Sequence, residues 1–416
     1  MDKVRMMKIY LLKLMTLFLV VFSLDSCQDP IFYTVAQETT LVKPLIDGSP
    51  SNSALFKNLI YVASGKNIFV FSEKKKNDEI KVKWSEFVRS DNYIVSLAAT
   101  GNSLYSIIIN KGNGKIRRYF NINITVDEDD DSKVNSYEYE DFDLEYNFQS
   151  IYTFGNVLFA SARNNDMTYT IFYKKEGANF IEIPPIKIPL EDSKTKPLDC
   201  MLNGLASDNK YYYFSTSSGV FYVEIGNIDS SSALPLKDEE DKIITGFTGI
   251  INLNDNYVAA ITKNGVLYEI KEAEITQKVS FKDNRNSTGA LFIWKDKKDP
   301  TKSLLLVGRD EYYYSTISRY TNGYVEIELD AEGRIKGEVF KEPGSKEKRI
   351  DEPTTIDKDK YDQYVSSLGK KIINHFIQAP SDLDSNMTLF ASTQKNGVWS
   401  YRDHGDGEGV TWNAEK

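Results

Sequence analysis

The sequence has few of the residues from which catalytic and metal sites are most often built. It contains only two histidines, His375 and His404, and only two cysteines, Cys27 and Cys200. Two cysteines cannot form a disulfide framework, and a chain of 416 residues buries enough apolar surface to fold without one. Neither histidine lies at a spacing typical of a metal site from other potential ligands, and neither belongs to a recognisable Ser-His-Asp grouping. The sequence therefore predicts no catalytic residue, no metal ligand and no cofactor.

Sustained helical periodicity is also lacking after residue 26, apart from a short stretch near residues 358–368. Proline is scarce, at 12 residues, whereas tyrosine and phenylalanine are abundant, at 26 and 22. Short runs of alternating apolar residues recur with turn residues between them, which is typical of antiparallel strands. These features exclude helical bundles and doubly wound folds and predict an all-β protein.

Excess positive charge is absent. The formal net charge is −9 at pH 7, and removal of residues 1–26, which carry a net charge of +2, takes the remainder to −11. An acidic surface repels phosphate backbones and anionic lipid headgroups. We therefore expect no nucleic-acid partner.

The N-terminus has the pattern of an export signal. Four basic residues, Lys3, Arg5, Lys8 and Lys13, precede an uncharged apolar run at 14–24. That run is shorter than the roughly 20 residues needed to span a bilayer. Residues 1–26 are therefore predicted to be a cleaved signal peptide.

The end of this signal resembles the lipobox of bacterial lipoproteins, in which a Leu, two small residues and a Cys are read by the lipoprotein signal peptidase. Leu24, Ser26 and Cys27 match, and Asp25 departs from the pattern. The resemblance implies that Cys27 is lipidated, and several acyl chains hold a protein at a membrane almost permanently. Gln28 after the cysteine favours the outer membrane. An ordinary signal peptide and a transmembrane anchor are the alternatives.

Paired strands recur along the chain. Three segments, 211–225, 257–270 and 389–401, each contain an alternating strand, a turn ending in Gly, then Val and a second strand. Gly219, Gly265 and Gly397 stand where a tight hairpin needs a positive φ. Looser copies lie at 59–71, 103–120, 157–173 and 304–318, the last turning at 308–310.

A spacing of about 40 to 50 residues between paired strands is typical of the blades of a β-propeller. Seven hairpins predict seven blades, with eight as the alternative. Each hairpin is preceded by an apolar run and followed by a more polar one, as inner and outer blade strands would be. Residues 31–37 are a candidate ring-closing strand. The predicted boundaries are a tether at 27–57, a propeller at 58–403 with a polar insertion at about 328–371, and a polar tail at 404–416.

Two acidic stretches are candidate cation sites. Residues 127–131 are all acidic and look like a solvated loop, because like charges this dense repel one another. In the tail, 403–412 loosely resembles the Asp-box of sialidase-type propellers, and Asp403, Asp406 and Glu408 offer oxygens to Ca²⁺. A solvated tail is the preferred interpretation.

Two aromatic runs, at 211–214 and 312–314, suggest either core packing or a platform for sugars. Only every second ring of a strand faces one side. Core packing between blades is therefore the preferred interpretation.

At the level of architecture and anchor, the chain resembles the propeller lipoprotein of the bacterial outer-membrane barrel assembly machinery, and its composition resembles that of spirochaete lipoproteins. The resemblance implies a monomeric, non-catalytic scaffold at the cell envelope that binds protein partners. A surface adhesin and a propeller hydrolase are the alternatives, because fold alone does not decide function.

Overall fold

A computed structural model describes one compact unit within residues 44–415. The described residues are 46, 48–76, 79–126, 132–142, 145–189, 194–280, 287–295, 303–310, 312–315, 318–320, 323–336, 368, 371–380, 388–403 and 410–415. The predicted signal peptide, Cys27, the candidate closing strand 31–37, the acidic residues 127–131 and His404, Asp406 and Glu408 all lie outside this part of the chain.

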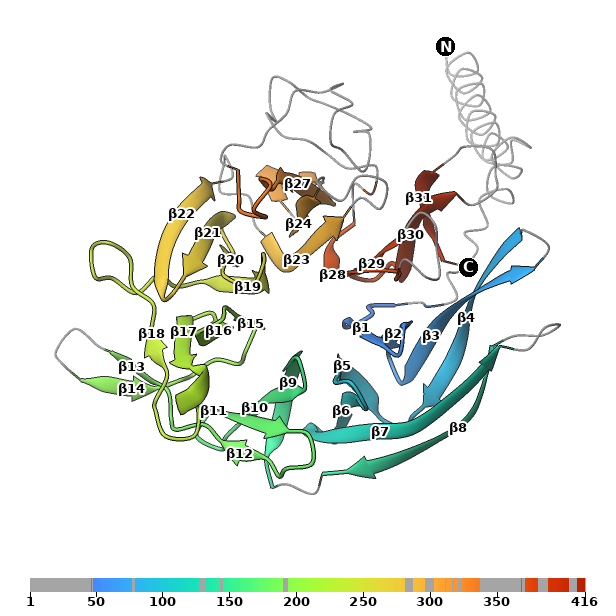
Figure 1. Cartoon of the computed structure of the whole chain (residues 1–416), viewed down its shortest axis with the longest axis horizontal. Helices are drawn as coiled ribbons and strands as arrows, with labels where there is room; N and C mark the ends of the chain where they lie inside the picture. The colour runs from blue at the N-terminus through green and yellow to red at the C-terminus, as the bar shows by residue number, and fades with distance from the viewer. Residues whose placement is uncertain are drawn as a thin grey trace, which may run out of the picture. The chain divides into compact units, whose positions relative to one another are not determined.

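The described residues form nine antiparallel sheets, of which seven are the blades of a β-propeller and two are short two-stranded ribbons (Figure 1). Blade 1 contains β1 (Ser53–Phe56), β2 (Leu59–Ser64), β3 (Asn67–Lys76) and β4 (Glu79–Arg89). Blade 2 contains β5 (Tyr93–Ala99), β6 (Leu104–Asn110), β7 (Asn113–Val126) and β8 (Ser132–Asp141). Blade 3 contains β9 (Asn147–Phe154), β10 (Val157–Arg163), β11 (Tyr169–Lys175) and β12 (Ile181–Glu182).

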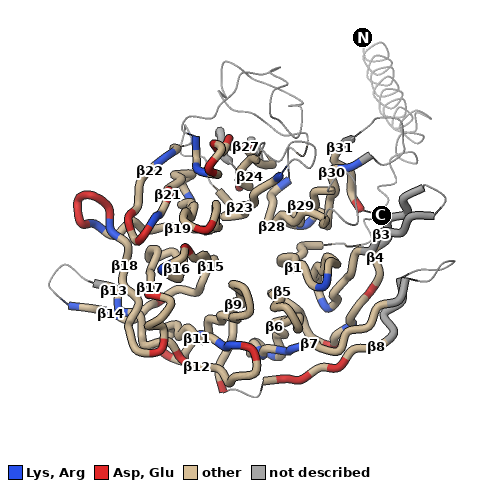
Figure 2. The backbone as a smooth tube through the Cα atoms, in the orientation of Figure 1, with Lys and Arg blue, Asp and Glu red and all other residues tan. Residues whose placement is uncertain are grey.

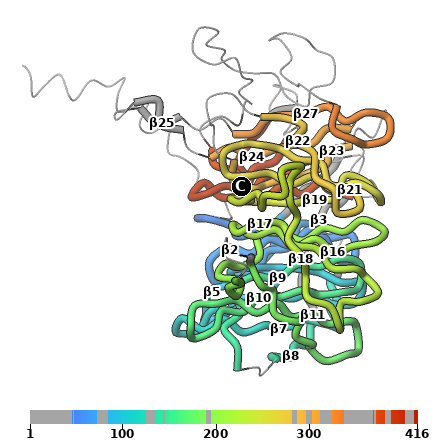
Figure 3. The backbone as a smooth tube through the Cα atoms, turned by 90° about the vertical axis from the view of Figure 1, so that its left-hand side faces the viewer, coloured from blue at the N-terminus to red at the C-terminus, as the bar shows by residue number. Residues whose placement is uncertain are grey.

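A short ribbon, β13 (Lys187–Pro189) and β14 (Thr195–Pro197), leads to the fourth blade. Blade 4 contains β15 (Gly204–Ser207), β16 (Tyr211–Thr216), β17 (Gly219–Glu224), the 3₁₀ turn η2 (Ile225–Asn227) and β18 (Leu234–Pro235). Blade 5 contains β19 (Phe247–Asn252), β20 (Val258–Thr262), β21 (Val266–Lys271) and β22 (Glu274–Ser280). The side view shows β17 and β18 between β21 above and β11 below (Figure 3).

Blade 6 contains β23 (Ser287–Lys295), β24 (Ser303–Arg309) and β27 (Tyr324–Glu328), with the hairpin β25 (Tyr312–Ser315) and β26 (Ser318–Tyr320) inserted. Blade 7 contains β28 (Ile373–Gln378), β29 (Leu389–Thr393), β30 (Val398–Asp403) and β31 (Val410–Ala414). The prediction of seven blades is thus confirmed. Gly219, Gly265 and Gly397 have φ values of 146°, 78° and 70°, which confirms their turns.

The hydrophobic core is divided into seven clusters, and each cluster lies between two neighbouring blades. Both faces of a blade are therefore covered, so the five residues of β20 (VAAIT) are all buried. Tyr212, Tyr213 and Phe214 are likewise buried on both faces of β16. Core packing is confirmed for this aromatic run, while the side chains of residues 312–314 lie outside the description.

Side-chain contacts join blade 7 to blade 1 and close the ring. Phe390 packs against Phe71 and Trp84, with ring centroids 4.6 and 5.5 Å apart. The indole of Trp84 donates a 2.9 Å hydrogen bond to Oε2 of Glu415, which is 2% exposed. Blade 7 already has four strands from the C-terminal part of the chain. The proposed closing strand at 31–37 is outside the described residues and stays a prediction.

The prediction of a hairpin turning at residues 308–310 is wrong. β24 pairs with β27, not with β25, so that Leu304 faces Glu328 and Gly308 faces Tyr324. β25 pairs only with β26. The physical reason is burial, since Val325 and Ile327 of β27 enter the core between blades 5 and 6.

The prediction of a polar tail at 404–416 is wrong for its second half. Residues 410–414 form β31, which pairs with β30 along five positions. Trp412 is 6% exposed and packs against Tyr324 and Tyr401. The chain needs these residues as the outer strand of blade 7.

Charge is distributed unevenly across each blade. The innermost strands β1, β5, β9, β15, β19 and β28 contain no Asp, Glu, Lys or Arg, and β23 has only Lys295 at its end. Outer strands such as β8 carry many charges (Figure 2). Within the described part of the chain, no helix has the length and apolarity needed to cross a membrane.

Candidate functional site: the axial channel

The innermost strands of all seven blades surround a cavity of about 560 Å³. Its lining is Ser51–Leu55, Val95–Ala99, Gln149–Thr153, Met201–Leu205, Thr248–Ile251, Thr288–Leu291, Asn374 and His375. None of these residues carries a carboxylate, an ammonium or a guanidinium group. A volume of this size is within the usual range for ligand sites.

Hydrogen bonds between neighbouring blades show that the inner strands run in the same direction. Ser96 Oγ donates to the carbonyl of Ile151 at 3.4 Å. Five residues further along in both blades, just past the ends of β5 and β9, the Gly101 N–H donates to Oδ1 of Asn156 at 3.2 Å. Residue numbers therefore increase in the same direction along β5 and β9, so these neighbouring inner strands are parallel. The beginnings of the inner strands lie at one face of the ring and their ends at the other.

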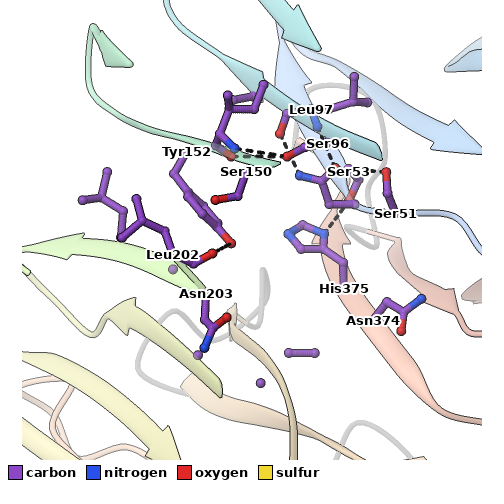
Figure 4. A pocket seen from close by; sticks show the side chains of 18 of the residues that line it. Ser51, Ser53, Ser96, Leu97, Ser150, Tyr152, Leu202, Asn203, Asn374 and His375 are labelled. Atoms are coloured by element: carbon purple, nitrogen blue, oxygen red, sulfur yellow. Dashed lines mark hydrogen bonds between the residues drawn. The ribbon is translucent and has the colours of Figure 1, made fainter. Parts of the chain in front are cut away.

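Most polar side chains of the lining are used to join blades. The bonds are Asn52 Nδ2 to the Leu97 carbonyl at 2.7 Å, the Leu97 N–H to Asn52 Oδ1 at 2.7 Å, Tyr152 OH to the Leu202 carbonyl at 3.3 Å, Asn203 Nδ2 to the Phe247 carbonyl at 2.8 Å and Asn374 Nδ2 to the Pro50 carbonyl at 3.2 Å. Figure 4 shows several of these side chains around the cavity. They satisfy backbone groups that would otherwise be unpaired at the inner edge of each sheet.

His375 is the only histidine of the lining. Its Nδ1 and the hydroxyl oxygen of Ser53 share a hydrogen bond of 2.6 Å, which links blade 7 to blade 1 (Figure 4). Burial lowers the pKa of His375 from 6.5 to about 4, because the charged imidazolium would lose its hydration. The ring is therefore neutral near pH 7. The described lining holds no carboxylate to orient this pair in the manner of a catalytic triad.

The lowered pKa of His375 predicts a pH-dependent stability. The unfolded chain binds a proton at a pKa near 6.5 and the folded chain only near 4, so the contribution is complete above about pH 6.5. We expect the free energy of unfolding to fall by roughly 2 kcal/mol between about pH 7 and about pH 5 from this residue alone. Urea unfolding at the two pH values measures the loss. His375→Asn is the control, and its free energy of unfolding should fall less between the two pH values, by about the same 2 kcal/mol. An equal fall in the native chain and the variant would contradict the burial of a neutral ring.

Exposed large apolar side chains gather on one part of the ring. Of the nine in the described residues, eight lie between positions 93 and 234, in blades 2 to 4, and we call them the blade 2–4 patch: Tyr93, Val95, Tyr139, Tyr146, Met167, Ile181, Met201 and Leu234. The ninth, Leu55, lies in the channel.

Five members of the patch share one face of the ring. Tyr93 and Val95 begin β5, while Tyr146 and Met201 stand just before β9 and β15. Met167 lies in the β10–β11 turn, beside the start of β9, because Arg163 pairs with Asn147. Val95 and Met201 also line the channel, so these two members of the patch belong to both surfaces.

The sequence missed both the channel and the patch. Of the predicted site residues, Cys27, His404, Asp406 and Glu408 lie outside the described residues, and Asp403 ends β30 with its side chain undescribed. No group of three or more metal-binding side chains exists among the described residues. The exposed Met and Tyr residues gave no signal in the sequence, because exposure depends on the neighbouring blades.

These features define a seven-bladed β-propeller. No family model matches the sequence, and no curated protein sequence matches it. Among solved structures, the chain is similar to the WD40 β-propeller domain of Doa1, with 8% identity over 86% of this chain and 94% of that one and a TM-score of 0.46. It is also similar to YCF48 bound to D1 peptide, with 11% identity over 86% and 93% and a TM-score of 0.43. The computationally designed protein Ika8 matches with 11% identity over 86% and 99% and a TM-score of 0.40. The fold assignment rests on the seven sheets themselves.

Proposed function

We propose that this chain is an exported lipoprotein, held at the cell envelope by acyl chains on Cys27, whose propeller is a non-catalytic scaffold for a protein partner. The export signal and the lipobox resemblance support the anchoring, and Gln28 supports the outer membrane. A rigid ring of seven blades supports the scaffold role, since it presents a broad face without rearrangement.

The observation that carries the proposal is the blade 2–4 patch. Tyr93 and Met167 are 61% and 58% exposed, and the described residues of blades 5 to 7 contain no comparable side chain. Exposed aromatic and Met residues are enriched at protein interfaces. The partner is therefore expected to contact this arc of the ring.

Two classes of partner follow from the lipoprotein resemblance. Subunits of the barrel assembly machinery would place the chain in outer-membrane protein assembly, and a host ligand would make it an adhesin. The hydrolase alternative has less support, because the described channel lining offers none of the carboxylates that such enzymes gather at the axis.

The test is affinity purification of the full chain from membranes in mild detergent, comparing the native chain with Tyr93→Glu/Met167→Glu. We expect the double variant to recover the partner more than about tenfold less well, because a charge in an apolar contact must be desolvated. The control is Asn264→Glu in the β20–β21 turn of blade 5, equivalent to the turn that holds Met167. It should bind normally.

The identity of the recovered protein decides between the assembly and adhesin roles. Mass spectrometry of the N-terminal peptide tests the anchor separately and should show acyl chains on Cys27. A partner that binds both glutamate variants equally, or an unmodified thiol at the mature N-terminus, would overturn the corresponding part of the proposal.

A further inference from the structure

The described lining of the axial channel is electrically neutral near pH 7. No described lining residue carries a charge, and the one histidine is neutral near pH 7. A charged group entering this space would lose hydration without meeting an opposite charge, which is strongly unfavourable. Uncharged ligands are therefore favoured.

Several polar side chains of the lining are already hydrogen-bonded within the protein. Asn52, Asn203 and Asn374 bond to the backbone of neighbouring blades, and Ser150 bonds to Ser161 at 2.7 Å. The hydroxyl of Tyr152, the only Tyr, Phe or Trp of the described lining, is bonded to the carbonyl of Leu202. The channel therefore offers a sugar a single tyrosine ring on which to stack.

Apolar side chains are available instead. Leu55, Val95 and Met201 of the lining are 47%, 38% and 43% exposed. Val95 and Met201 stand at the mouth, where the lining meets the blade 2–4 patch. A partner that covers the patch would place its own chain directly over this opening. The second ring nitrogen of His375 points into the cavity, where it can bond to one amide (Figure 4).

We propose that the channel takes an uncharged peptide segment of the partner, with apolar side chains on Val95 and Met201 and an amide near His375. This inference rests on the proposed scaffold function and names the chemistry of the segment that binds. It assigns the patch to docking and the channel to selection against charge.

Capped dipeptides test this inference on the purified full chain. The probes are N-acetyl-Leu-Gln-amide, its near-isosteric anion N-acetyl-Leu-Glu-amide and the cation N-acetyl-Leu-Lys-amide, with maltose as a neutral sugar, all followed by saturation-transfer NMR. We expect the Gln probe to bind, and both charged probes to bind at least about tenfold more weakly.

A charge placed in the lining should change this order. Thr153 lines the channel, so Thr153→Asp should weaken the Gln probe and strengthen the Lys probe, while the isosteric control Thr153→Asn should leave the order unchanged. The inference is overturned if no dipeptide binds, if the charged probes bind equally well, or if maltose binds and the Gln probe does not. If the partner still depends on Tyr93 and Met167 in that event, only the channel inference fails and the scaffold proposal stands.

Discussion

A chain that ends at Asp403 is expected to lose cooperative folding altogether. The truncation removes β31, whose Trp412 is 6% exposed and donates a 3.3 Å hydrogen bond to the hydroxyl of Tyr324 in blade 6. It also removes Glu415, which accepts bonds from Trp84 and Arg402. Loss of one buried Trp alone costs about 3 to 5 kcal/mol, and the whole stability of a domain is about 5 to 15 kcal/mol.

Urea unfolding followed by tryptophan fluorescence and circular dichroism measures this loss. Deletion of Lys416 alone is the control and should leave the transition unchanged. Glu415→Ala is an intermediate case, expected to cost about 3 kcal/mol because it leaves the buried indole N–H of Trp84 unpaired and separates Arg402 from its partner. If the truncated chain unfolded at the same urea concentration as the full chain, residues 404–416 would be a dispensable tail.

The second large effect is expected from a single methyl group. A Cβ at Gly249 of β19 would lie 2.1 Å from the carbonyl oxygen of Gly289 in β23. The contact is backbone against backbone, so no side chain can move aside. Gly249→Ala must separate the inner strands of blades 5 and 6, and we expect a loss of at least about 3 kcal/mol.

Gly226→Ala is the matched control. Gly226 lies in η2, where a Cβ would meet no atom within 4 Å. The same substitution should change the free energy of unfolding by no more than about 0.5 kcal/mol. Equal effects at the two glycines in thermal or urea unfolding would show that the inner strands do not approach one another as the ring requires.

The repeat unit was predictable because each blade contains local signals. A strand, a turn ending in Gly219, Gly265 or Gly397 and a second strand are neighbours in the sequence, so alternation and positive φ reveal them without knowledge of the ring. The apolar inner strand before each hairpin and the more polar outer strand after it were predicted in the same way. These features depend on burial within a single blade.

Features set by contacts between blades were not predictable. The sequence at 304–318 looks like a hairpin, and only the burial of Val325 and Ile327 against blade 5 shows that β27 is the partner of β24. Trp412 looked like part of a polar tail, because Tyr324, its partner in blade 6, is distant in the sequence. The channel and the patch likewise arise only when inner strands from seven blades meet.

Closure of the ring between blades 7 and 1 is the claim on which the channel, the patch and the predicted stabilities all depend. Selective labelling of Phe and Trp allows a direct test by NMR, because Trp84 and Phe390 have ring centroids 5.5 Å apart in the core between these two blades. The closed propeller predicts a cross-peak between the two rings that disappears in Phe390→Leu. An assigned spectrum of the folded chain with no contact between Trp84 and Phe390 would contradict the closed ring.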